Sequence, residues 1–233
     1  MKKGSGYLLM YPLTAAVILA CVWWGSRGVT AFSENLPMER SVRIVIDPGH
    51  GGVDGGAVSC TGAPESRYNL EISRRLSDLC VFLGYETILL REDDVSLYTK
   101  GETIAQKKLS DLKERLRIIQ ETEDALLLSI HQNHFPDPVY SGAQVFYGNT
   151  PGSKDLAETL QESIRSHLDP GNHRRPRKIR GIYLMDRIRC TGVLIECGFL
   201  SNHQEEAMLR DPAYQKKLCA VIATGISGFL SNT

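Results

Sequence analysis

The sequence lacks a net charge, because its 27 basic side chains balance 27 acidic ones over 233 residues. A surface that attracts nucleic acid is therefore not indicated, and no nucleic-acid-binding motif is present. Internal repeats and low-complexity tracts are also absent from the sequence. With 42% hydrophobic residues, a chain of this length predicts one globular domain with a full core and leaves little room for a second.

The six cysteines include no Cys-x-x-Cys pair, which argues against a zinc site built from thiolates. An even number of cysteines would permit disulfides in an exported chain. However, Cys80 and Cys219 lie in helical patterns of apolar residues, and Cys197 ends an apolar segment typical of a strand. We therefore predict that these thiols are buried as small apolar side chains.

One long apolar run is present, over residues 7–24, and it follows two lysines near the start of the chain. A basic start followed by an apolar segment is typical of an export signal. The run also approaches the ~17–25 residues that cross a bilayer. We expect residues 1–31 to be a signal peptide or a membrane anchor, residues 32–40 a linker, and residues 41–233 the folded domain.

From residue 41 onward, segments with strand and helix patterns alternate along the chain. This alternation predicts a single α/β domain with a mostly parallel mixed sheet, flanked by helices on both faces. The expected strands are Arg43–Asp47, Tyr85–Arg91, Ala125–Ile130, Ala143–Tyr147, Gly181–Met185 and Gly192–Cys197. The expected helices are Ser66–Leu83, Thr103–Glu121, Ser153–Leu168 and Pro212–Leu230.

The most informative stretch is Ile44–Gly52, in which apolar residues lead into an acid, a proline and a histidine set among glycines. This pattern indicates a buried strand that ends in a tight loop presenting the imidazole of His50. His131 follows another apolar strand, and Glu196 ends the last one. Because the carboxyl ends of parallel strands share one edge of a sheet, we expect the three side chains to meet there.

A fourth ionisable residue, Glu65, lies between the first strand and the first helix. Two histidines and one carboxylate form the usual open zinc site, and a second carboxylate can act as general base. The spacing alone leaves open which glutamate has which role, although the rigidity of a strand favours Glu196 as the base. From position and residue type alone, structural hydrogen bonding explains the histidines about as well as a metal site does.

Taken in order, these stretches resemble the zinc-dependent N-acetylmuramoyl-L-alanine amidases, over Arg43 to Leu230. The matching segments are Ile46–Gly52, Asp54, Gly56-Ala57, Glu65, Ser129–Asn133 and Leu194–Asn202. The resemblance implies an α/β fold and cleavage of the bond between the lactyl group of N-acetylmuramic acid and the L-alanine of the peptidoglycan stem peptide. It also implies one Zn²⁺ per chain, held by His50, Glu65 and His131, with Glu196 as the catalytic carboxylate.

The resemblance extends to the sporulation and germination branch, which prepares the spore cortex for muramic δ-lactam formation. The features that indicate this branch are the apolar N-terminal segment, the absence of a repeated wall-binding module and the expected strand from Gly181. The family usually has proline before the last strand, where this chain has Thr191, and we expect activity to survive that difference. Vegetative wall turnover is the main competing role. The same residues would also suit a zinc peptidase, or a wall-binding module with an inactive site.

The expected partners follow from the resemblance. Peptidoglycan is the substrate, and an activating or regulatory partner protein is a further expectation because some such enzymes need one. Contact with the membrane would occur only through residues 1–31. The amidase domain would be extracytoplasmic, either anchored in the membrane or secreted into the cell wall or the intermembrane space of the forespore.

Several other residues have two interpretations each. Asp47 could accept a hydrogen bond from the free N–H of a ligand histidine, or cap the loop backbone. Asn133 could bind substrate or stabilise a turn. The basic run His173–Arg180 could hold stem-peptide carboxylates or anionic wall polymer, although a solvated loop is the simpler interpretation. Arg115 is expected in a surface ion pair on the long helix.

Overall fold

The computed structural model describes residues 42–232, so the expectations for residues 1–40 lie outside it. Six strands of this part form one sheet in the order β2-β1-β3-β6-β4-β5. The strands are β1 (Arg43–Pro48), β2 (Glu86–Leu89), β3 (Ala125–Asn133), β4 (Gln144–Tyr147), β5 (Arg177–Lys178) and β6 (Thr191–Phe199). The first four in this order are parallel, and β4 is antiparallel to β6, which confirms a mostly parallel mixed sheet.

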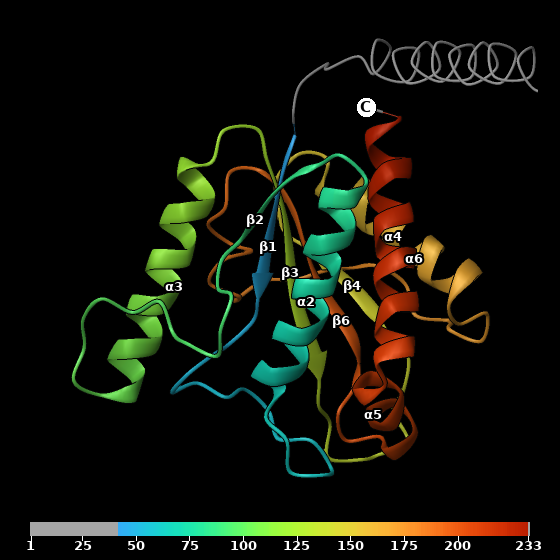
Figure 1. Ribbon diagram of the computed structural model, residues 1–233, viewed down its shortest axis with the longest axis horizontal. Helices are drawn as coiled ribbons and strands as arrows, with labels where there is room; N and C mark the ends of the chain where they lie inside the picture. The colour runs from blue at the N-terminus through green and yellow to red at the C-terminus, as the bar shows by residue number, and fades with distance from the viewer. Residues whose placement is uncertain (1–41, 233) are drawn as a thin grey trace, which may run out of the picture. The chain divides into compact units, whose positions relative to one another are not determined.

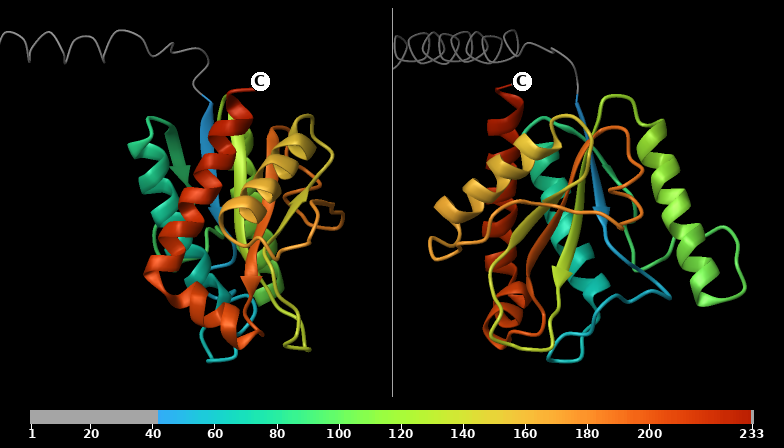
Figure 2. Two further views of the ribbon diagram at one scale, coloured as in Figure 1. Left: turned by 90° about the vertical axis from the view of Figure 1, so that its right-hand side faces the viewer. Right: turned by 180° about the vertical axis from the view of Figure 1, so that it is seen from behind.

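Helices cover both faces of the sheet, as predicted. The helices of the described residues are α2 (Glu65–Phe82), α3 (Ile104–Glu121), α4 (Ser153–His167), α5 (His203–Arg210) and α6 (Pro212–Leu230). Figures 1 and 2 show α6 beside α2, and α6 also contacts α4. Along β1, Ile44 and Ile46 belong to the core cluster under these three helices, whereas Val45 packs in the other cluster with Ile119 of α3. The buried residues of β1 thus alternate between two covered faces.

The strand order determines which edge of the sheet can bind a ligand. β1 lies between β2 and β3, although β2 comes between them in the sequence. Such a reversal in direction opens a crevice at the carboxyl ends of neighbouring strands, where α/β proteins bind ligands. The loops after β1, β3 and β6 lie together at one end of the domain, opposite the start of β1 and the end of α6 (Figures 1 and 2).

Two of the long helices, α3 and α6, begin where the sequence supplies a side-chain cap. At the start of α3, Thr103 accepts a hydrogen bond from the backbone N–H of Gln106, and the side chain of Gln106 accepts one from the N–H of Thr103. This reciprocal pair satisfies two backbone donors that the first turn leaves free. Asp211 caps α6 in a similar way, through the N–H of Ala213, with Pro212 in the first turn.

The predicted strand at residues 181–185 is wrong. The segment forms helical turns, in which the N–H groups of Asp186 and Ile188 donate to the carbonyls of Ile182 and Leu184, each at 2.9 Å. The apolar side chains Leu184, Met185 and Ile188 recur at helical spacing, and they pack together in the cluster of α3. The short strand β5 forms upstream instead, so residues 181–185 lend no support to the sporulation branch. The helix α5 was not predicted, although Asn202 caps it.

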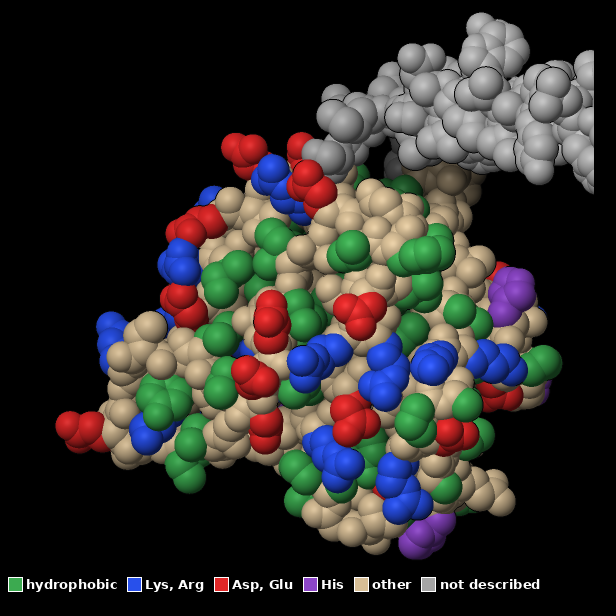
Figure 3. Space-filling model, viewed as in Figure 1, with side chains coloured by type: hydrophobic (Ala, Val, Ile, Leu, Met, Phe, Trp, Pro, Cys, Tyr) green, Lys and Arg blue, Asp and Glu red, His purple; other side chains and the backbone are tan. Residues whose placement is uncertain are grey.

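Three further expectations concern thiols, membranes and charge. Cys80, Cys197 and Cys219 are buried and unpaired, as predicted, whereas Cys60 is exposed and Cys190 is half-buried. Between residues 42 and 232, no helix has the length and apolar character needed to cross a bilayer. On the face shown in Figure 3, basic and acidic side chains are interspersed, in keeping with the balanced charge of the sequence.

Candidate metal centre

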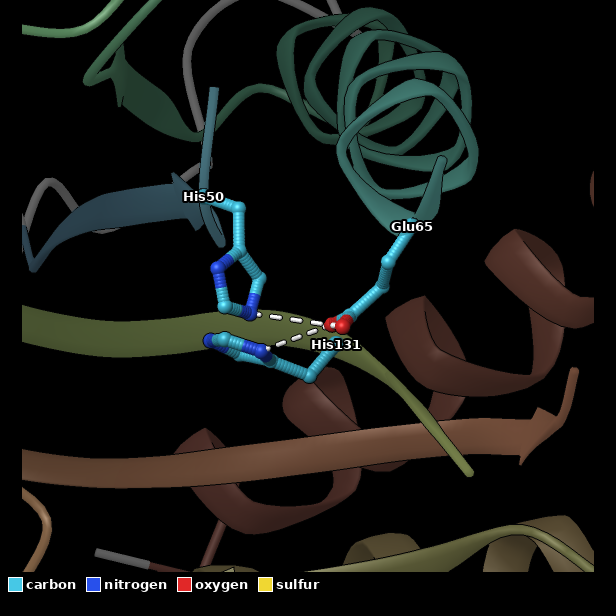
Figure 4. Close-up of side chains that lie close together, drawn as sticks. All are labelled: His50, Glu65 and His131. Atoms are coloured by element: carbon cyan, nitrogen blue, oxygen red, sulfur yellow. Dashed lines mark hydrogen bonds and ion pairs between the residues drawn. The ribbon is translucent and has the colours of Figure 1, made fainter. Parts of the chain in front are cut away.

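Three side chains from separate elements point toward one another at the carboxyl ends of β1 and β3 (Figure 4). His50 follows β1, Glu65 is the first residue of α2, and His131 lies in β3. One nitrogen or oxygen from each lies within 4.8 Å of the other two. Nε2 of His50 is 3.3 Å from Oε2 of Glu65, and Nδ1 of His131 is 3.0 Å from Oε1 of the same carboxylate.

The carboxylate of Glu65 is held in place from several sides. Oε1 accepts hydrogen bonds from the N–H of Gln132 and from Nδ2 of Asn69, each at 3.1 Å, and Oε2 accepts one from the N–H of Ala57 at 3.0 Å. Burial alone would raise the pKa of Glu65, but the hydrogen bonds to His131 and His50 outweigh it and hold that pKa far below its usual range. The side chain is therefore ionised, as a metal ligand must be.

The backbone is shaped around these three groups. A Cβ at Gly49 would lie 2.3 Å from Nε2 of His131, and a Cβ at Gly56 would lie 2.6 Å from Oε2 of Glu65. His50 has a φ of 59°, in the left-handed region that residues other than glycine rarely adopt. Close approach and local strain are typical of functional groups held for a ligand. Two imidazoles and a carboxylate are also the donor set of catalytic zinc sites, so the residues fit Zn²⁺.

Asp54, not Asp47, is the carboxylate beside a candidate ligand histidine. Its Oδ2 lies 3.0 Å from Nδ1 of His50 and 2.9 Å from Nζ of Lys108. Burial would lower the pKa of His50, but the contacts with Asp54 and Glu65 raise that pKa to about 9. A carboxylate on the second ring nitrogen orients a ligand imidazole and increases its basicity.

Asp47 supports the His50 loop in another way. Its two oxygens accept hydrogen bonds from Nη1 of Arg115 and, at 2.7 Å, from Oγ of Ser129. Arg115 is 2% exposed, so the expectation of a surface ion pair is wrong. The guanidinium also donates to the carbonyls of Pro48 and His50, at 2.8 and 2.7 Å. The sequence pattern of α3 shows which face of the helix is polar. It does not show that the loop after β1 packs against that face and buries Arg115.

We expect Arg115→Met to lower the free energy of unfolding by about 3–5 kcal/mol, because it leaves the buried carboxylates of Asp47 and Asp111 without their partner. Arg117→Met on the same helix is the matched control, since Arg117 pairs with Glu114 in solvent and its loss should change stability by less than about 1 kcal/mol. Urea denaturation measures both. Equal effects of the two substitutions would contradict the stabilising role assigned to Arg115.

Glu196 lies on β6, the strand next to β3, beside the three candidate metal ligands. It lies opposite His131 in the pairing of β3 with β6, and paired residues of adjacent strands point to the same face. Its Oε2 is buried and has no hydrogen-bond partner. Burial raises the pKa of Glu196 to about 7, although the charge of His131 opposes the shift. A carboxyl with a free oxygen and a pKa near neutrality can both accept and return a proton.

The remaining candidates lie outside this group. Asn133 ends β3, where its carbonyl accepts a hydrogen bond from the N–H of Leu200 at 2.8 Å. In the basic run, Arg174 is half-buried and lies over the ring of Phe199, whereas Arg177 is exposed, so only part of the run is a solvated loop.

Sequence reasoning missed two buried residues that hold the site. Asn69 joins Glu65 to the carbonyl of Gly49, at 3.1 Å from each. Arg91, 2% exposed, donates to the carbonyls of Gly49 and Ser66, at 3.0 and 2.9 Å. The partners of Arg91 are backbone carbonyls, which no sequence pattern identifies. Asn69 lies one helical turn after Glu65, a spacing that could have suggested their contact.

Comparisons with known proteins agree with this geometry. A family model described as N-acetylmuramoyl-L-alanine amidase matches residues 44–228. The chain is 38% identical over 194 residues to the germination-specific N-acetylmuramoyl-L-alanine amidase of Bacillus subtilis (strain 168), an alignment that covers 82% of this chain and 81% of the relative.

Solved structures show the same similarity. The CwlD amidase from Clostridioides difficile, solved in complex with the GerS lipoprotein, is 39% identical with a TM-score of 0.79, over 82% of this chain and 99% of that one. An N-acetylmuramoyl-L-alanine amidase from Clostridium difficile 630 is 29% identical with a TM-score of 0.71, over 82% of this chain and 97% of that one. The family model spans most of the sequence, and the fold and donor set accord with it. This chain therefore belongs to the N-acetylmuramoyl-L-alanine amidase family of peptidoglycan-cleaving enzymes.

Proposed function

We propose that this amidase is a zinc enzyme that holds one Zn²⁺ through His50, Glu65 and His131 and uses Glu196 as its catalytic carboxylate. The observation that carries the proposal is the convergence of the three donors, from separate elements, beside a buried carboxyl oxygen without a partner. The chemistry that zinc supplies when bound is Lewis acidity, which lowers the pKa of a water molecule to ~7 and polarises a carbonyl.

The residues of the chain would carry out the proton transfers and orient the ligands. Glu196 accepts a proton from the attacking water as the new bond to the lactyl carbonyl carbon forms. It returns that proton to the alanine nitrogen as the C–N bond breaks, because an amine leaves poorly without protonation. Asp54 orients His50 through Nδ1, while Asp47 acts on the same loop through Arg115.

Asn133 remains a proposed substrate contact. Its position two residues after His131 places it on the same face of β3, one row beyond the catalytic groups.

We further propose a role in spore cortex maturation, in which the amidase product leads to muramic δ-lactam. Its support is the germination-specific relative, whose alignment covers most of both chains. Vegetative wall turnover is the alternative. Muropeptide analysis of spores from a deletion strain separates the two roles, because only the first predicts loss of δ-lactam from the cortex.

The location and partners belong to the same proposal. Residues 1–31 would export or anchor the chain, and residues 32–40 would link this segment to the catalytic domain. Residues 41–233 would act as the catalytic domain outside the cytoplasmic membrane. The solved relative bound to a lipoprotein supports an activating or regulatory partner protein here as well.

The experiment that tests the catalytic proposal is zinc analysis of the purified chain, followed by mass analysis of the muropeptides it releases. We expect about one zinc per chain, and products with a free N-terminal L-alanine and intact glycan. A chelator should abolish release, and added zinc should restore it. Cuts between amino acids would instead identify a peptidase. A zinc-loaded chain that releases nothing would favour an inactive wall-binding module.

A further inference from the structure

A row of polar side chains crosses the sheet at the proposed catalytic carboxyl. Gln144 of β4 lies opposite Glu196 on one side, as His131 of β3 does on the other. Residues paired across adjacent strands point to the same face, so these three side chains stand in one line. At the far end of the line, Nη1 of Arg174 lies 3.3 Å from Oε1 of Gln144.

The next row supplies a platform for this arginine. Phe199 pairs with Asn133, and the register of β3 against β6 shifts between His131 and Asn133. The extra residue in β6 turns Phe199 back to the face that carries Glu196. The ring of Phe199 is 4% exposed. The guanidinium of Arg174 lies over it, 4.6 Å from the ring centroid. A buried ring under a guanidinium fixes the orientation of the charged group.

The charge of Arg174 lacks an ionic partner. Among residues 42–232, no carboxylate lies within ion-pair distance of it, and its hydrogen bonds go to neutral oxygens, the carbonyl of Ser141 at 2.7 Å and the side chain of Gln144. Glu205 is the nearby buried acid, but its two oxygens accept from the N–H groups of Gly142 and Phe199, each at 2.8 Å. Arg174 is therefore a half-buried cation that is positioned but not neutralised.

We propose that Arg174 binds a free carboxylate of the stem peptide, two to three residues beyond the bond that is cut. This inference rests on the proposed roles of Glu196 and zinc. Neighbouring strands lie ~4.8 Å apart, and an extended peptide advances ~3.3–3.6 Å per residue, so a peptide leaving Glu196 along the row reaches Arg174 at that distance. The planar guanidinium can bind both oxygens of a carboxylate, which an amide cannot match.

The test pairs a substitution in the enzyme with a change in the substrate. One substrate is a muramyl tripeptide with free carboxylates on its second and third residues, and the other carries primary amides at both positions. We expect the wild-type enzyme to cleave the acid with a kcat/KM about tenfold higher, mainly through KM. Arg174→Gln should lose this preference and cleave both substrates at the rate of wild type on the amide. Arg174→Lys should retain a part of the preference.

Lys178→Gln is the matched control, because it removes another positive charge from the same basic run. In the sheet, Lys178 lies opposite Tyr147, whose side chain packs in the core cluster of the other face, so Lys178 points away from Glu196. The substitution Lys178→Gln should therefore leave the preference unchanged. A purely structural role for Arg174 predicts that Arg174→Gln lowers activity on both substrates by the same factor, and that result would overturn the proposal. Equal cleavage of both substrates by the wild-type enzyme would overturn it too. A wild-type enzyme that cleaves neither would contradict the proposed function itself.

Discussion

Glu196→Gln should lower kcat on peptidoglycan by about a thousandfold or more, while the zinc content stays unchanged. Positioned general acids and bases contribute ~10²–10⁴-fold to rate, and here one group is asked to move the proton in both directions. The glutamine keeps the shape of the side chain but cannot take up the proton. Burial raises the pKa of Glu196 to about 7, so ionising the wild-type carboxyl at neutral pH costs stability, and a neutral amide does not have that cost.

Two readouts make this test specific. Thermal unfolding of Glu196→Gln should occur at the wild-type temperature or above it, since active sites often store such instability. Zinc measured per chain in the same preparation excludes loss of the ion as the cause. Near-full activity in a variant that retains zinc would show that another group carries the proton.

His131→Ala should abolish both zinc binding and activity. His131 is one of three proposed donors, and its ring lies so close to Gly49 that a side chain there would collide with it. Loss of a hydrogen-bond partner behind a ligand weakens metal binding ~10–100-fold, and loss of the ligand itself should exceed that. We therefore expect the zinc content after dialysis to fall from about one per chain to a small fraction, and the activity to fall with it.

The matched control is His134→Ala. His134 lies three residues further along the chain and is exposed, so its imidazole is chemically equivalent but outside the group. This variant should retain zinc and activity. If His131→Ala keeps its zinc, or if both variants lose it equally, the assignment of the donors would be wrong.

The fold was largely predictable from the sequence. The main error of the prediction, at residues 181–185, arose where packing rather than local sequence decides the structure. Strands such as β1 and β3 are apolar runs of the length that a doubly covered sheet requires, and the period of α2 or α6 is visible in the sequence. The strand prediction for residues 181–185 failed because a short apolar run after glycine is compatible with either a strand or helical turns. Its packing beside α3 decides between them, and that packing is not a local property.

The candidate donors could be identified in the sequence, but the residues that hold them in place could not. His50, His131 and Glu196 are recognisable as ionisable residues at the ends of apolar strands. Arg115 lies on a helix and has no such mark, and Arg91 ends the predicted strand Tyr85–Arg91 without having been identified as part of the site. Both are buried and donate to the carbonyls of the His50 loop. Arg174 could not be distinguished within a basic run whose other members are mostly exposed.

The sequence by itself determined the α/β class, the candidate donors and the edge of the sheet where they meet, because residue type and periodicity are local properties that follow from side-chain chemistry and backbone geometry. Only the tertiary structure decided which partner each buried charge has: Asp54 for His50, Asp47 for Arg115, and none for Glu196. The physical reason is that a buried charge must be compensated by whatever group folding brings to it. That group can come from any distance along the chain, so it leaves no mark beside the residue it serves.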